Sequence, residues 1–208
     1  GPSNLLTTTI GDELRLHTNL RSKVIGISRK DRGAILPGGH LGDAYWYEGS
    51  TGNFVTSTYY MEELPEWLQE FNARNLAQEY LSQPWETLLP IEEYVESMED
   101  DNPYESLHAD QDAPVFPHDL PRRVEEHGAG PGLLSGTPFG DKLLLELAFA
   151  AMEGESLGRN GTTDMLNISC SATDGVGHSY GPASIEIQDH IMRLDRYVEE
   201  LLNHLDSE

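Results

Sequence analysis

The stretch Asp164-Met165-Leu166-Asn167-Ile168, followed directly by Ser169-Cys170-Ser171-Ala172-Thr173-Asp174-Gly175-Val176-Gly177-His178-Ser179-Tyr180-Gly181-Pro182, decides the fold. The first part is a short apolar run, which predicts a buried strand. The second part is rich in small and polar residues and predicts a loop, and a long helical pattern opens at Pro182. The loop is therefore expected at the carboxyl end of a strand, where open α/β sheets bind their ligands.

This loop contains a carboxylate, Asp174, and an imidazole, His178, four residues apart. The small residues between them let the backbone fold tightly and aim both side chains at one point. An oxygen ligand together with a nitrogen ligand suits zinc or a similar divalent ion. Zinc takes about four ligands, so the pair alone leaves a second interpretation open. In that interpretation Asp174 caps a turn and His178 is a surface residue.

Two cations follow another apolar run, at residues 24–27, which predicts a short buried parallel strand. Lys30 and Arg32 lie at its carboxyl end, and residues two apart point the same way if the strand continues. An arginine fork and a lysine point charge suit the oxygens of a phosphate group. A solvated basic turn is the alternative that these two residues leave open.

Several stretches in combination resemble a known family. They are residues 5–14 and 22–28, Lys30-Asp31-Arg32-Gly33-Ala34-Ile35-Leu36-Pro37-Gly38-Gly39-His40, Ala44-Tyr45-Trp46-Tyr47, and the segment from Asp174 to Pro182. Over nearly its whole length the chain is similar to the bacterial alkaline phosphatases of the one-domain, zinc-dependent type. These enzymes belong to the alkaline phosphatase and nucleotide pyrophosphatase superfamily. The resemblance implies an α/β fold with a mainly parallel sheet flanked by helices, plus a mixed α+β insertion.

The resemblance also implies two zinc ions and a Thr or Ser nucleophile. Asp174 and His178 match one pair of the family's zinc ligands, and Lys30 and Arg32 match its two cationic phosphate binders, a pair typical of monoesterases. The nucleophile and the other ligands, an early Asp, an adjacent Asp-His pair and a last His, match no residue of this chain. Asp189-His190 lies inside a predicted helix, and the threonines at 7–9 match a different segment of the family. We therefore expect the chain to be an internal piece of the enzyme.

The function implied for the complete enzyme is phosphate monoester hydrolysis by a two-zinc site, with a phospho-enzyme formed on the nucleophile. The chain alone is expected to be inactive, and its partners are the phosphate monoester and the rest of the parent polypeptide. The family also implies a periplasmic or secreted location. Two alternatives remain: a phosphodiesterase or nucleotide pyrophosphatase of the same superfamily, and a non-catalytic module that binds anions or metal.

Composition narrows these possibilities. The chain has 208 residues, enough for one domain with a core, and carries 36 acidic against 13 basic residues, a net charge of −23. Such a surface repels nucleic acids, so nucleic-acid binding is excluded. An anionic phosphate must then meet a local positive site built from metals and a few fixed cations. The single Cys170 permits no intrachain disulfide, and no apolar run is long enough to span a membrane.

Three pieces are predicted along the chain: residues 1–37, part of the α/β core with the phosphate-binding strand end; 38–137, a cap-like insertion with a hairpin and a helix; and 138–208, part of the core with the metal-ligand loop. Helices are expected from Thr8 or Thr9 to 19, at 64–81, at 139–153 and at 183–206. A turn is expected at 37–40, and hairpin strands are expected at 44–48 and 53–59. The last helix is expected to pack on the sheet through Ile187, Ile191, Leu194, Val198, Leu201 and Leu205. His190 and His204 are expected on its surface, Cys170 is expected to be buried, and His40 is expected to serve structure or solvent.

Overall fold

The structure is a computed structural model that describes residues 1–107 and 112–207. The chain divides into two compact units, each assembled from segments that are distant in the sequence. The first unit consists of Gly1–Glu48, Gly52–Asn75 and Leu143–Ser171, and the second of Gly49–Thr51, Leu76–Lys142 and Ala172–Glu208. The predicted pieces 1–37, 38–137 and 138–208 stay a prediction.

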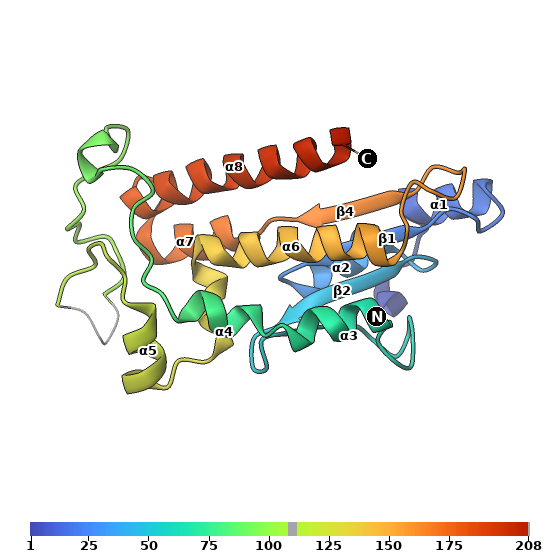
Figure 1. The fold of residues 1–208 in the computed structure, drawn as a ribbon, viewed down its shortest axis with the longest axis horizontal. Coiled ribbons are helices and arrows are strands. Elements are labelled where there is room, and N and C mark those ends of the chain that lie inside the picture. Colours follow the sequence, from blue (N-terminus) through green and yellow to red (C-terminus); the bar gives the residue numbers. More distant parts are fainter. Residues whose placement is uncertain (108–111, 208) are drawn as a thin grey trace. The chain divides into compact units, whose positions relative to one another are not determined.

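In the described part of the chain, the first unit is built on a four-stranded sheet with the order β3-β2-β1-β4 (Figure 1). The strands are β1 (Val24–Ser28), β2 (Asp43–Glu48), β3 (Asn53–Val55) and β4 (Met165–Ser169). β1 pairs in parallel with β2 and with β4, whereas β2 and β3 form an antiparallel hairpin. The α/β fold with a mainly parallel sheet is confirmed, as is the hairpin, although its second strand ends at Val55.

Burial differs between the two strands that were expected to be buried. All five residues of β1 are buried, because this strand has a partner on each side. The five residues of β4 are only half-buried, and so is Cys170 after it, so the prediction of burial was wrong there. The reason is topological, since β4 is the outer strand of the sheet within the described residues.

Two helices pack closely on one face of the sheet because glycines let the backbones approach. They are α1 (Ile10–His17) and α2 (Asp31–Gly38). A Cβ on Gly26 of β1 would overlap the backbone oxygen of Ala34 in α2, and one on Gly11 would press on Val24. α1 begins with a capping box, in which the Thr9 side chain accepts a hydrogen bond from the backbone N–H of Asp12.

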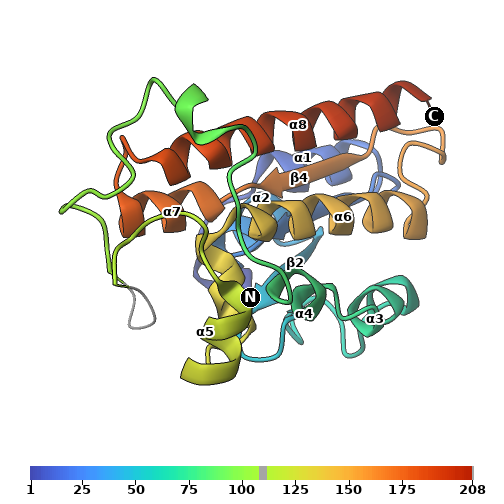
Figure 2. The same cartoon turned by 60° about the vertical axis from the view of Figure 1, so that its left-hand side comes forward.

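The opposite face of the sheet is covered by α3 (Glu66–Ala73) and by residues 143–154 of α6 (Pro138–Gly154) (Figures 1 and 2). Side chains alternate along β2: Ala44 packs with Ala34 and Ile35 beneath α2, and Tyr45 points the other way. The ring of Tyr45 meets Trp67 of α3 edge-on, with centroids 5.3 Å apart. The sheet therefore lies between two helical layers, as an α/β fold requires.

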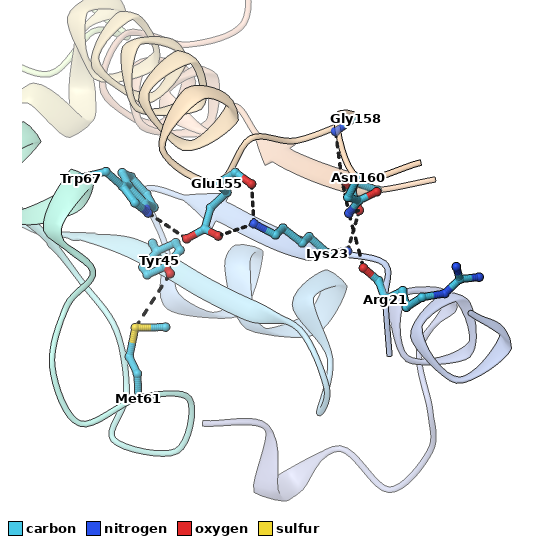
Figure 3. Close-up of polar contacts among 9 residues, drawn as sticks. Arg21, Lys23, Tyr45, Met61, Trp67, Glu155, Gly158 and Asn160 are labelled. Carbon is cyan, nitrogen blue, oxygen red and sulfur yellow. Dashed lines mark hydrogen bonds and ion pairs between the residues drawn. The ribbon is translucent and has the colours of Figure 1, made fainter. Parts of the chain in front are cut away.

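A group of polar contacts ties the segments near the amino ends of β1 and β4 together (Figure 3). Lys23 Nζ lies 3.1 Å from Glu155 Oε2, and Glu155 Oε1 accepts a hydrogen bond of 2.9 Å from the indole of Trp67. The carboxylate of Asp164 accepts hydrogen bonds from Lys23 N at 2.7 Å and from the amide of Asn160 at 2.9 Å. These contacts fix the end of the sheet opposite to the one where parallel strands usually bind ligands.

Gly26→Ala should destabilise the first unit, by about 1–3 kcal/mol, because its methyl group would meet the backbone of α2 and not a movable side chain. The measurement is the free energy of unfolding from urea titration. The matched control is Gly136→Ala, because a Cβ at this position meets open space. Gly161→Ala would be a poor control, because Gly161 has a positive φ that alanine disfavours. Equal stability of the two variants would contradict this account of the packing.

The second unit is mostly helical, and its core is aromatic. Its elements are α4 (Leu76–Leu81), η2 (Ile91–Glu93), α5 (Leu120–His127), η3 (Pro131–Gly136), the first residues of α6, α7 (Ala172–Tyr180) and α8 (Ile185–Ser207); the remaining short helix, η1 (Pro2–Asn4), belongs to the first unit. The fully buried Trp85 lies 5.3 Å from Phe116, 5.1 Å from His118 and 6.0 Å from Tyr180, measured between ring centroids. α7 and α8 pack on each other (Figure 2).

Three helix predictions need correction. The expected turn at 37–40 was wrong in its first half, because Pro37 and Gly38 are the last residues of α2. The single helix expected at 64–81 is two helices, since Asn75 between them has a left-handed backbone, with a φ of 52°. α1 begins after its cap Thr9 and ends at His17, before the predicted end at 19.

α8 was predicted correctly as a helix but not in its packing. Its buried positions are Ile185, Glu186, Asp189 and His190. The apolar stripe that was expected to be buried is largely at the surface, with Ile191 48% and Leu205 51% exposed. The buried polar residues of α8 contact other parts of the second unit, since Glu186 lies beside His118, Asp189 accepts from Trp85, and His190 lies beside Thr173 of α7. None of the helices in residues 1–107 and 112–207 has the length and apolarity needed to cross a membrane.

Candidate functional site

The cation pair, Lys30 and Arg32, lies at the carboxyl end of β1, but the strand does not continue through it. β1 ends at Ser28, and α2 begins at Asp31, so Lys30 is the N-cap and Arg32 lies in the first helical turn. The hydroxyl of Ser28 accepts a hydrogen bond of 3.1 Å from Lys30 N, which turns the chain from the strand into the helix. The expectation that both side chains extend from one strand was therefore wrong.

The local electrostatics at this strand end are positive although the protein is strongly acidic. Lys30 is half-buried and Arg32 is exposed. Both lie at the amino end of α2, where the helix dipole adds partial positive charge. The carboxylate between the two cations, Asp31, is bound in part by the backbone, since its Oδ1 accepts a hydrogen bond of 2.7 Å from Arg32 N. The strand end can therefore attract an anion.

The ligand pair, Asp174 and His178, lies on a helix and not in a loop. α7 spans both residues, which are one helical turn apart and therefore share one face of the helix. Asp174 Oδ1 and His178 Nε2 are 3.3 Å apart, and their side chains are 51% and 81% exposed. The prediction of a loop was wrong, whereas the convergence of the two side chains is confirmed. An oxygen and a nitrogen donor so placed could hold a metal ion together.

The two pairs belong to different units, the cation pair to the first and the ligand pair to the second. Within residues 1–107 and 112–207, no three or more His, Cys, Asp and Glu side chains come together in a way that could hold a metal ion. The second unit thus has two side chains on α7 that could donate to a metal ion, and the first unit has a strand end with two cations.

The other polar residues near the start of the chain have structural roles. Thr9 caps α1, and the hydroxyl of Thr8 donates a hydrogen bond of 2.7 Å to Glu13. His40 Nδ1 lies 3.2 Å from the buried carboxylate of Asp12. Burial acts to raise the pKa of Asp12, but hydrogen bonds from backbone N–H groups and from His40 outweigh it and hold this pKa below its ordinary value. The structural role expected for His40 is confirmed.

Asp189-His190, the adjacent Asp-His pair of the chain, is buried. Asp189 is fully buried and accepts hydrogen bonds from the side chains of Trp85, Tyr94 and Arg193. His190, which was expected at the surface, is also fully buried, because α8 turns its polar stripe inward. Both residues are occupied by contacts within the second unit.

A second buried acidic group was missed by the sequence analysis. Glu186 is fully buried and lies 2.8 Å from His118 Nε2, and Glu105 is 8% exposed. Burial, together with the nearby carboxylates, raises the pKa of each to about 8. The sequence signal that could have found part of this group is the polar spacing at 186, 189, 190 and 193, which repeats with the period of a helix.

Residues 19–208 match the model of the type I phosphodiesterase / nucleotide pyrophosphatase family. The chain belongs to this family. The predicted superfamily is thereby confirmed. Curated relatives within the superfamily extend the match beyond the family model to almost the whole chain.

Three of these relatives are similar at 45–48% identity over 99% of the chain. They are the alkaline phosphatase PhoV of Synechococcus elongatus, with 48% identity, a protein of Myroides odoratus named as a calcium-transporting ATPase, with 48%, and the alkaline phosphatase PafA of Elizabethkingia meningoseptica, with 45%. The crystal structure of PafA covers the whole chain with a TM-score of 0.94 and 44% identity. A second PafA structure is a variant with four substitutions, a lysine and an arginine two positions apart among them.

This member of the type I phosphodiesterase / nucleotide pyrophosphatase family spans only 37–40% of the length of these relatives. The likeness therefore establishes the family and the fold of this part of the protein. It also agrees with the enzyme class expected from the sequence, because two of the three relatives are named as alkaline phosphatases.

Proposed function

We propose that this chain forms part of a zinc-dependent phosphate monoesterase, in which Asp174 and His178 bind one zinc ion and Lys30 and Arg32 bind the phosphate. The observation that carries the proposal is the geometry of the ligand pair. Two ligands of a tetrahedral zinc with bonds of about 2.0–2.2 Å lie roughly 3.3–3.5 Å apart. Asp174 Oδ1 and His178 Nε2 are 3.3 Å apart and accessible, so their separation matches that of two ligands of one zinc ion.

The cation pair supports the choice of a monoester. The terminal phosphate of a monoester is a dianion, and two cations stabilise it more than they stabilise the single negative charge of a diester. Lys30 and Arg32 would contact the non-bridging oxygens, and the amino end of α2 would add its positive dipole. The PafA variant described above replaces a lysine and an arginine with the same spacing as this pair.

Bound at the ligand pair, zinc would supply Lewis-acid stabilisation of the leaving oxygen and a water of lowered pKa. Asp174 and His178 would fix the position of the ion, and Lys30 and Arg32 would hold the non-bridging oxygens of the phosphate as negative charge develops. The nucleophile, a second zinc ion and the remaining ligands belong, in this proposal, to other parts of the whole protein. The proposal includes a periplasmic or secreted location, which the family resemblance given in the sequence analysis implies.

The test uses a protein of the relatives' length that contains this chain. Lys30→Ala and Arg32→Ala should each lower kcat/KM for an aryl phosphate monoester by about 10²–10³-fold, the size expected when one charge-stabilising donor is removed. The loss for the corresponding diester should be at least tenfold smaller, because a diester carries less charge for the cation pair to hold. Steady-state kinetics on both substrates measures the effect.

The matched control is Arg21→Ala, which removes an exposed arginine of the same unit that hydrogen-bonds the backbone of Thr18. It should leave both rates within twofold. Equal losses on monoester and diester in the two cation-pair variants would contradict the assignment. They would favour the phosphodiesterase or nucleotide pyrophosphatase alternative that the family's name describes.

A third substrate, ATP, helps to test the non-catalytic alternative. Because one relative is named as an ATPase, ATP hydrolysis should be measured beside the aryl esters. A whole protein that binds zinc at Asp174 and His178 but cleaves none of the three substrates would support the non-catalytic binding module.

A further inference from the structure

The first turn of α7 is held from two sides by buried polar residues. Asp141 of α6 accepts a hydrogen bond of 3.2 Å from the backbone N–H of Ala172, the first residue of α7. His190 of α8 places its Nε2 2.9 Å from the hydroxyl of Thr173 and 3.3 Å from Asp141 Oδ2. Asp141 and His190 are both fully buried, and all these residues lie in the second unit.

The hydrogen bonds of His190 indicate which ring nitrogen carries the proton. Within the described part of the chain, its buried Nδ1 has no hydrogen-bond partner. A proton on Nδ1 would be a buried donor without an acceptor, which is costly. The proton therefore belongs on Nε2, which faces the Thr173 hydroxyl and the Asp141 carboxylate. This tautomer lets His190 connect the first turn of α7 to α6.

Close backbone contacts restrict the same turn further. A Cβ on Gly175 would overlap the backbone oxygen of Ser135 in η3, and a Cβ on Gly140 would lie 2.6 Å from the backbone oxygen of Leu134. A rotation of α7 about its axis would break the Ala172 and Thr173 contacts and press Gly175 into η3. The rotation and the starting point of the helix are therefore fixed.

We propose that Asp141 and His190 are positioning residues, which hold α7 in the rotation that presents Asp174 to the metal ion. Asp174 directly follows Thr173, and each residue advances an α-helix by about 100°, so an error of one residue in the rotation of α7 would turn Asp174 and His178, which share one face, together away from the ligands that other parts of the whole protein supply. Metal ligands need placement within about 0.5 Å. This inference rests on the proposed zinc site and adds its supporting residues.

A merely structural role would have a different signature. If Asp141 only stabilised the fold, its loss would lower the free energy of unfolding and leave zinc binding by the folded protein unchanged. If it positions Asp174, the folded variant should bind zinc more weakly. Loss of an outer-shell partner typically costs about 10–100-fold in metal affinity.

The experiment uses a protein of the relatives' length that contains this chain, with labelled histidine, and follows the imidazole resonances of His178 by NMR during titration with zinc. Asp141→Ala should weaken zinc binding at His178 by about tenfold and speed amide exchange in the first turn of α7. Asp141→Asn keeps an oxygen that can accept from Ala172 N–H, and it should restore at least part of the affinity. His190→Gln provides a second test, because its amide can still donate to Thr173, and its affinity should lie close to that of the unsubstituted chain.

The control is Asp119→Ala, which removes the same kind of contact from another helix of the unit, since Asp119 caps α5 by accepting from Arg122 N–H at 3.0 Å. It should lower stability, by about 1 kcal/mol, and leave zinc affinity unchanged. Unchanged affinity in folded Asp141→Ala would overturn the positioning role while leaving the zinc site intact. Absence of any zinc effect on His178 in the unsubstituted protein of the relatives' length would overturn both.

Discussion

Asp189→Asn is expected to lower the free energy of unfolding of the second unit by about 3–5 kcal/mol. The fully buried carboxylate accepts four hydrogen bonds: at Oδ1 from Leu88 N and the hydroxyl of Tyr94, both 2.6 Å, and at Oδ2 from Trp85 Nε1 and Arg193 Nε, both 2.7 Å. Asparagine has the same shape but only one accepting oxygen. Its NH₂ group would face two donors, leaving buried polar groups unsatisfied and the charge of Arg193 uncompensated.

Urea unfolding followed by circular dichroism measures this loss. Asp195→Asn is the matched control, because it makes the same chemical change at an exposed position of α8 and should shift stability by less than about 0.5 kcal/mol. A loss below about 1 kcal/mol for Asp189→Asn would show that the network is not needed for the fold.

The stability of the protein should also fall as the pH rises from about 4.5 to 8, and Glu105→Gln should remove part of that fall. Glu105 is 8% exposed, and neither carboxylate oxygen has a hydrogen-bond partner among the described residues. Burial, followed by the charges of Glu186, Asp100 and Asp101, raises its pKa to about 8. Folding must therefore keep Glu105 protonated at neutral pH, where the unfolded chain would release the proton.

The sign follows from proton binding. Below about pH 4.5 both states of the chain hold this proton, and the group makes no difference to stability. Between pH 4.5 and 8 the unfolded chain loses the proton first, so each pH unit costs about 1.4 kcal/mol for one group. Above pH 8 both states are ionised and the loss levels off.

Glu186 contributes in the same direction. Its pKa is raised to about 8 by burial first and then by Asp100 and Asp189, although hydrogen bonds from its own backbone N–H and from Ser184 act the other way. The Nε2 of its neighbour His118 lies 2.8 Å from Oε1 of the same carboxyl group. The two glutamates interact, so replacing one should ease the ionisation of the other.

The measurement compares Glu105→Gln with the unsubstituted chain at several pH values. Their difference in unfolding free energy should grow in favour of the variant, by about 4–5 kcal/mol, between pH 4.5 and 8.5. Glu92→Gln, at an exposed position, should show no such trend. A difference that stays constant with pH would mean that Glu105 is ionised in the folded protein.

The first unit was largely predictable because its sequence patterns are local. The apolar run at 24–27 became β1, and the hairpin strands expected at 44–48 and 53–59 became β2 and β3. In each case the pattern depends on residues that are neighbours in the chain. Burial by the rest of the unit only reinforced it.

α7 was not predictable in this way. Its sequence contains Gly175 and Gly177, which disfavour a helix by roughly 1 kcal/mol each relative to alanine. The helix forms because its packing outweighs that cost, and Gly175 is needed where α7 touches the backbone of Ser135. The residue that weakens the helix locally is the one that allows its tertiary contact.

In the candidate site, too, the sequence predicted the features that depend on neighbouring residues and missed those that depend on contacts between distant residues. The spacing of Asp174 and His178 indicated a pair of donors, and the structure brings them together. The sequence could not indicate Asp141, which is 31 positions from the Ala172 N–H that it binds. On α8 the apolar residues suggested the buried face, but the hydrogen bonds of Asp189 and His190 decided it. The roles of Lys30 and Arg32 in phosphate binding stay predictions.

The outer strand β4 has a consequence for the behaviour of concentrated solutions. Its half-buried side chains and outward backbone groups form, within the described residues, an edge onto which a strand of another molecule could add. The net charge of −23 opposes such encounters, since molecules of like charge repel one another. That repulsion acts over about 10 Å at 0.1 M salt and about 3 Å at 1 M. High salt should therefore bring the protein closer to strand-to-strand aggregation, and storage at low ionic strength should keep it dispersed.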